Sequence, residues 1–81
     1  MTEMINNIGA RMITKARLVN RFMESWLAGN EEGNMRSNPY YSEFQGMCQL
    51  LKAMDMEYEI QYSDDVSKIT AIVIMGKAFA V

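Results

Sequence analysis

The sequence contains no histidine and a single cysteine, and these two shortages narrow the chemistry open to the protein. One cysteine cannot form a disulfide within the chain, and a structural zinc site needs several cysteine or histidine ligands. A nucleophilic Cys48 would need a base beside it, and histidine usually serves as that base. We therefore expect no enzyme activity, no catalytic residue, no metal and no cofactor.

The sequence also lacks the patterns of a transmembrane helix and of a secretory signal. No apolar run approaches the about 18 residues that a transmembrane helix needs, and the first residues lack the basic and apolar regions of a secretory signal. The composition, with 49% hydrophobic and 22% charged residues, is typical of a globular chain. The length predicts one domain over residues 1–81. The free thiol and nine methionines favour a reducing cytoplasm, and we expect no membrane partner.

Apolar residues recur with the period of a helix in the first third of the chain. This pattern predicts a helix over residues 2–28, ended by Gly29. Gly9 costs about 1 kcal/mol relative to alanine inside a helix, so a later start near Asn7 is the alternative. The stripe expected in the core comprises Ile5, Ile8, Met12, Ala16, Val19, Met23 and Trp26.

A polar loop at residues 29–38 precedes a second helical pattern over residues 39–54. Asn38 followed by Pro39 is typical of an N-cap and the first helical position. A start at Ser42, with Gln45 completing a capping box, is the alternative. The stripe expected in the core comprises Tyr40, Phe44, Met47, Leu51 and Met54, with Leu50 beside it.

The last third of the chain predicts a β-hairpin. Residues 56–63 alternate apolar and polar side chains, residues 64–67 are typical of a turn, and residues 68–75 are β-branched and apolar. Residues 76–81 are left as a tail. The predicted fold class is α+β in the order ααββ, with two amphipathic helices packed on one face of a C-terminal antiparallel hairpin.

The second strand of this hairpin has apolar residues on both faces. Pairing Ser63 with Lys68 turns the face bearing Ile60 toward the helices. The other face then leaves three residues outside the core: Thr70, Ile72 and Ile74. A register shift of one residue would exchange the faces. Because a lone two-stranded sheet is marginally stable, we predict that a second copy covers this face and completes the fold as a homodimer.

Charge is distributed unevenly along the chain. Residues 1–30 carry four basic and two acidic groups, a net charge of +2, whereas residues 31–81 carry four basic and eight acidic groups, a net charge of −4. The four basic residues of the first helix are Arg11, Lys15, Arg17 and Arg21. They form two i,i+4 pairs of like charge, which are unfavourable in an isolated helix and favour a role in binding. We predict a larger protein as the partner of this face.

No catalytic or ligand-binding motif is present in the sequence. Small, acidic chains without motifs are often phage or mobile-element products that inhibit or modulate a larger host protein. We therefore predict a small non-enzymatic cytoplasmic protein that acts through protein–protein binding. The alternative is an accessory protein that binds nucleic acid through its basic first helix.

Overall fold

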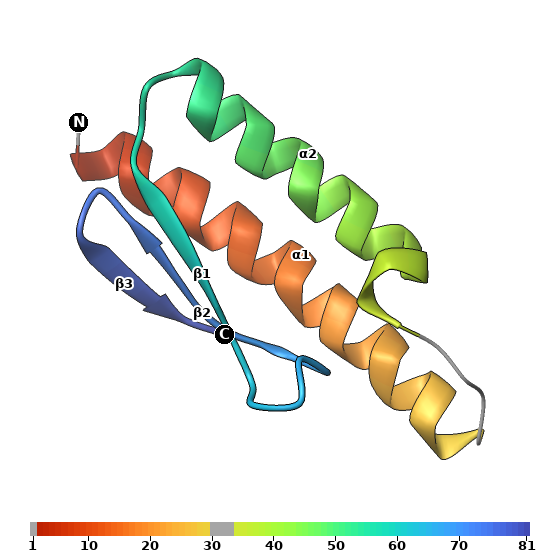
Figure 1. Cartoon of the computed structure of the whole chain (residues 1–81). Coiled ribbons are helices and arrows are strands. Elements are labelled where there is room, and N and C mark those ends of the chain that lie inside the picture. The colour runs from red at the N-terminus through yellow and green to blue at the C-terminus, as the bar shows by residue number, and fades with distance from the viewer. Residues whose placement is uncertain (1, 30–33) are drawn as a thin grey trace.

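In the computed structural model, which describes residues 2–29 and 34–81, two helices pack against a three-stranded antiparallel sheet (Figure 1). The elements are α1 (Thr2–Ala28), the 3-10 turn η1 (Met35–Ser37), α2 (Pro39–Ala53), β1 (Tyr58–Tyr62), β2 (Ile69–Ile74) and β3 (Lys77–Ala80). The α+β class and both helices are confirmed. The predicted loop at residues 29–38 contains η1, and its residues 30–33 lie outside the described part of the chain.

Asn38 determines where α2 begins and ties that end to α1. Its side-chain oxygen accepts hydrogen bonds from the backbone N–H groups of Tyr40 and Tyr41, at 3.0 and 3.3 Å, which confirms the predicted N-cap. Its amide nitrogen donates to the carbonyl oxygen of Val19 in the middle of α1, at 2.9 Å. The side chain is fully buried, and both of its polar ends are satisfied.

The core lies between α1 and the two parts of the fold that pack on it, α2 and the sheet. α1 packs against α2 on one side and against β2 and β3 on another, so it contributes to both halves of the interior. The fully or almost fully buried apolar residues are Met12, Ala16, Val19, Met23, Met35, Phe44, Cys48, Leu51, Met56, Ile69, Ile72 and Ile74. Of the helices formed by residues 2–29 and 34–81, none has the length and apolar character needed to cross a bilayer.

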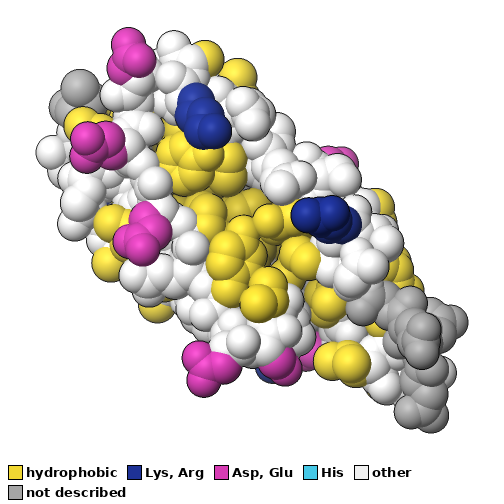
Figure 2. All heavy atoms as spheres, in the orientation of Figure 1, with side chains coloured by type: hydrophobic (Ala, Val, Ile, Leu, Met, Phe, Trp, Pro, Cys, Tyr) yellow, Lys and Arg dark blue, Asp and Glu magenta, His cyan; other side chains and the backbone are white. Residues whose placement is uncertain are grey.

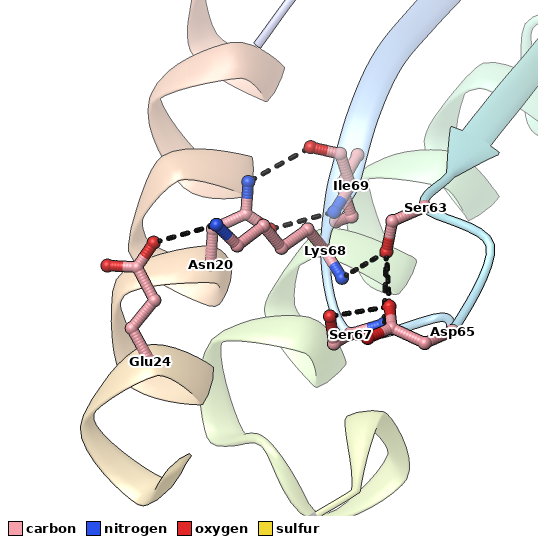
Figure 3. A network of polar contacts seen from close by, with 7 residues as sticks. All are labelled: Asn20, Glu24, Ser63, Asp65, Ser67, Lys68 and Ile69. Carbon is pink, nitrogen blue, oxygen red and sulfur yellow. Dashed lines mark hydrogen bonds and ion pairs between the residues drawn. The ribbon is translucent and has the colours of Figure 1, made fainter. Parts of the chain in front are cut away.

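A side chain of α1 holds the start of β2 (Figure 3). The Asn20 amide nitrogen donates to the backbone oxygen of Ile69 at 2.9 Å, and the Asn20 side-chain oxygen accepts from the Ile69 N–H at 2.8 Å. One residue along, the Lys68 ammonium lies 3.2 Å from a carboxylate oxygen of Glu24 on α1. α1 therefore supplies the hydrogen bonds that a neighbouring strand would supply elsewhere.

The turn before β2 is organised by Asp65. Its carboxylate accepts hydrogen bonds from the hydroxyl groups of Ser67 and Ser63, at 2.7 and 2.8 Å, and from the Ser67 N–H at 3.1 Å (Figure 3). These hydrogen bonds, those from Ser67 first, hold the pKa of Asp65 below its ordinary value. The next residue, Val66, has a left-handed backbone with φ of 56°, which is strained for a β-branched residue.

The hairpin begins in the register named first and then changes to the alternative, shifted by one residue. Tyr62 pairs with Ile69 as expected, but Gln61 pairs with Ala71, so Thr70 is an extra residue in β2. This irregularity shifts every later pair, and Ile60 faces Ile72 rather than Ala71. Ile72 and Ile74 are fully buried against the helices instead of lying on the outer face.

The predicted tail at residues 76–81 instead contains β3, paired with β2. Met75 and Gly76 have φ of 50° and 81° and connect the two strands in a tight turn. On the inner face of β3, the ring of Phe79 lies directly on Gly9 of α1. A Cβ added at Gly9 would lie 2.5 Å from Cε1 of Phe79. Gly9, unfavourable for the isolated helix, is therefore required by the packing of β3.

We predict opposite effects for alanine at the two helical glycines. Gly9→Ala should destabilise the fold, because the new methyl group collides with the Phe79 ring. Gly46→Ala should stabilise it by about 1 kcal/mol, because alanine is the better helix former and, beyond the two adjacent residues and the backbone of α2 itself, no described atom lies within 4 Å of the added Cβ. Urea unfolding of the two variants checks both signs. Stabilisation by Gly9→Ala would contradict the contact with Phe79.

We predict that Asn20→Leu lowers the free energy of unfolding by about 2–4 kcal/mol, because it leaves the buried N–H and C=O of Ile69 without partners. The matched control is Asn7→Leu at an exposed position of α1, where a change within about 0.5 kcal/mol is expected. Denaturant unfolding measures both. Equal effects of the two substitutions would show that the Asn20 hydrogen bonds do not hold β2.

Candidate functional site

A groove between the two helices exposes apolar side chains that the sequence pattern assigned to the core. Met54 was expected to be buried and is 49% exposed, and Leu50 beside it is 65% exposed. The groove has a volume of about 210 Å³. Its lining, which defines the interhelical groove below, consists of Ile8, Arg11, Met12, Met47, Leu50, Leu51 and Met54.

The groove lies where the N-terminal half of α1 runs beside the C-terminal half of α2 (Figure 1). Met4, one turn before Ile8, adds a further apolar side chain at this end that is 40% exposed. Leu50 and Met54 are separated by one helical turn, so their side chains lie on the same face of α2. This i,i+4 pair at the margin of the core stripe is the sequence signal that could have revealed the groove.

The four predicted basic residues do not form one surface. Arg11 lines the interhelical groove. Lys15, one turn later, points to α2, where its ammonium lies 2.8 Å from a Glu43 carboxylate oxygen and 5.9 Å from the centre of the Tyr40 ring. The charge of Lys15 is therefore used within the fold.

Arg17 and Arg21 are exposed on another side of α1. At 3.6 residues per turn they project about 120° around the helix axis from Arg11 and Lys15. The structure thus divides the predicted basic face into two pairs. Of the four residues, only Arg11 reaches the groove.

The predicted oligomer interface is corrected by the register. Ile72 and Ile74 are fully buried, so they cannot contact a second copy in the folded chain. Thr70 is exposed, and its hydroxyl group donates to the Gln61 carbonyl oxygen at 3.1 Å. The outer face carries small residues in their place, with Val73 paired to Ala78.

A second hollow, of about 240 Å³, lies between α2 and β1, and we call it the α2–β1 cleft. Figure 2 shows hydrophobic side chains gathered between these two elements. The cleft is lined by Tyr41, Phe44, Gln45, Cys48, Gln49, Lys52, Tyr58, Ile60 and Tyr62. The hydroxyl oxygens of Tyr41 and Tyr62 lie 2.8 Å apart and join α2 to β1. Burial, and then this hydrogen bond, raise the pKa of Tyr62.

A larger hollow, of about 570 Å³, lies at the other end of the molecule, beside Leu27 of α1 and Val66 of the β1–β2 turn. Polar side chains interrupt its lining, among them Asn34, Arg36 and Asp65. The interhelical groove is more uniformly apolar, since Arg11 is the one polar residue among the described residues that line it. A predominantly apolar lining fits the side chains of another protein better.

Neither hollow beside α2 suggests small-molecule chemistry. Pockets for small ligands usually enclose about 300–1,000 Å³, which exceeds both volumes. Within residues 2–29 and 34–81, no three acidic or cysteine side chains gather as a metal site would require. Comparison with known proteins adds no relative, since no protein-family model, curated protein or solved structure matches the chain.

We predict that the Cys48 thiol is unreactive in the folded protein. Burial raises its pKa to about 11, and the opposing effect of Lys52 is smaller. Alkylation by iodoacetamide should therefore be slow at pH 8 and should rise steeply only as the pH approaches that value. The denatured chain, at pH 8 in urea, is the control and should react rapidly. Equal rates for folded and denatured chain at pH 8 would contradict the burial of the thiol.

Proposed function

We propose that the protein acts by binding a larger protein through the interhelical groove. The supporting observation is the exposure of Leu50 and Met54, at 65% and 49%, beside an apolar hollow. Exposed apolar surface of this kind is costly in water and is typical of a surface that a partner covers. Met47 and Met54 supply flexible, polarisable side chains that adapt to the shape of a partner, and the fully buried Met12 lies beneath them.

The partner segment that fits best is an amphipathic helix. A groove between two helices accepts apolar residues at i, i+3 or i+4, and i+7 from a third helix. Arg11 is the polar member of the lining, so an acidic residue at the rim of the partner helix would complement it. The basic helix face predicted from the sequence contributes to this site through Arg11.

We further propose that the chain is a cytoplasmic protein of phage or mobile-element type, which inhibits or modulates a host protein. It rests on the small size, the acidic net charge and the absence of motifs. Binding of nucleic acid remains the alternative. Arg11, Arg17 and Arg21 are exposed, but Arg11 lies on a different side of α1 from the other two and Lys15 is paired with Glu43, so the four do not form one basic face.

We predict that Leu50→Glu combined with Met54→Glu weakens partner binding by roughly 30-fold or more, as expected for residues at the centre of an interface. Both side chains are already exposed, so the circular dichroism and the melting temperature should change little. The matched control is Leu27→Glu, because Leu27 is 60% exposed and lies outside the groove.

The partner is sought by affinity purification from the native host with and without nuclease treatment. Binding is then remeasured with the purified partner by calorimetry. Loss of binding with Leu50→Glu/Met54→Glu and retention with Leu27→Glu supports the proposal. Loss with Leu27→Glu alone would move the site to the hollow beside Val66. Recovery only through nucleic acid, abolished by Arg17→Glu with Arg21→Glu, would establish the alternative.

A further inference from the structure

The sheet has two open edges, and β1 forms the longer one. Among the strands in the described part of the chain the order is β1-β2-β3, so β1 and β3 each have a strand neighbour on one side only. The Met75 N–H donates to the Glu57 oxygen at 2.8 Å, and the Ser63 N–H donates to the Lys68 oxygen at 3.0 Å. Odd-numbered residues of this segment therefore face β2, since antiparallel strands alternate. The residues whose backbone groups face the open edge are Tyr58, Ile60 and Tyr62.

The sequence of β1 reads almost the same in both directions. It is Tyr58-Glu59-Ile60-Gln61-Tyr62, with glutamate and glutamine as the single departure from a palindrome. A two-fold dimer formed through a strand edge pairs that strand with itself, in antiparallel orientation. With the axis at Ile60, isoleucine lies opposite isoleucine, tyrosine opposite tyrosine, and Glu59 opposite Gln61.

We propose that β1 pairs with β1 of a second copy about an axis at Ile60, which joins the two sheets into one of six strands. This register uses all three outward-facing residues and forms about six hydrogen bonds across the axis. A register centred on Glu59 would place two carboxylates directly opposite each other, which is destabilising. Charge and hydrogen bonding thus select the same register.

The side chains beside the edge support this pairing. Tyr58 and Ile60 are half-buried and Tyr62 is 36% exposed, all on the face toward the helices. They line the α2–β1 cleft, and the two-fold axis would bring the clefts of both copies together. Tyr58 of each copy then lies across from Tyr62 of the other, where cross-strand aromatic pairs stabilise a sheet.

The other edge of the sheet is less suited to self-pairing. The Val81 N–H donates to the Thr70 oxygen at 3.1 Å, so residues 77, 79 and 81 face β2. Only Ala78 and Ala80 direct their backbone N–H and C=O groups toward the open edge of β3. The strand also carries Lys77, a residue type that protects edges from pairing. β1 carries neither lysine nor proline.

The pairing also leaves the proposed binding site free. α2 contributes Gln45, Gln49 and Lys52 to the α2–β1 cleft, whereas it contributes Met47, Leu50 and Met54 to the interhelical groove. These sets lie on different sides of the helix. Self-association at β1 is therefore independent of the proposed function, and each can fail without the other.

Charge substitution at Gln61 tests the register. Gln61→Lys places an ammonium opposite Glu59 twice in the dimer, and Gln61→Glu places a second carboxylate there. Sedimentation velocity from about 1 to 200 μM should give a dimer whose dissociation constant falls with lysine and rises with glutamate. Two pairs at about 0.2–1 kcal/mol each correspond to about 2- to 30-fold. Asn7→Lys and Asn7→Glu make the same charge changes on exposed α1.

A disulfide test gives a second, position-specific readout in the Cys48→Ala background. Residues 59 and 61 of opposite copies form a pair with Cα atoms about 4.5 Å apart, within disulfide range. Glu59→Cys mixed with Gln61→Cys should crosslink under mild oxidation. Either variant alone should not, because its cysteines lie about 7–8 Å apart on the diagonal.

Three outcomes would overturn the proposal. The first is a wild-type protein that is monomeric throughout the concentration range. The second is a dimer that responds identically to lysine and glutamate at position 61, or responds as strongly to the Asn7 controls. The third is a crosslinked dimer from either cysteine variant alone with none specific to the mixture.

Discussion

The pair of hydrogen bonds between the Asn20 side chain and the backbone of Ile69 is the constraint on which the sheet depends. It fixes one residue of β2 against the middle of α1, and alternation then determines which later residues face the helices. The extra residue Thr70 follows immediately, so Ile72 and Ile74 turn inward together. Without a fixed point at Ile69, the two apolar faces of β2 would compete for the core.

A second asparagine plays the corresponding part for the helices. Asn38 caps α2 and donates to Val19, one residue before Asn20 in α1. Two adjacent residues of α1 therefore position α2 on one side and β2 on the other. Both asparagines exchange hydrogen bonds with backbone groups, which restricts geometry more closely than apolar packing does. This explains how a chain of 81 residues with one cysteine can specify a single arrangement.

The helices were predictable because their signals are local. The core stripe of α1 and the cap at Asn38 could both be derived from neighbouring residues. The register was not predictable, because it depends on a contact between residues 49 positions apart. β3 was missed because the turn before it has Met75 at a position of positive φ. Such positions usually hold asparagine or glycine, and methionine gives no sign of a turn.

The candidate site was predicted only in part, for a related reason. Arg11 was identified from its charge. Periodicity predicted Met54 in the core, but in the structure this side chain is half exposed. The 3.6-residue period locates an apolar face but not its width, which depends on how far the neighbouring helix covers it. The groove and the open edge of β1 lie on different sides of α2. A dimer would hence carry two grooves, and a partner with two suitable helices would bind it with increased avidity.

The contacts between α1 and the sheet also have a kinetic consequence. Lys77 donates a hydrogen bond to Asn6, a partner 71 positions earlier in the chain, and Phe79 rests on Gly9. The sheet-facing stripe of α1 is therefore synthesised before the strands that cover it. A helical hairpin can form early from local contacts, yet its apolar surface stays open until residues 69–80 emerge from the ribosome. Folding is thus completed in a late step, and the nascent chain is most prone to aggregate just before it.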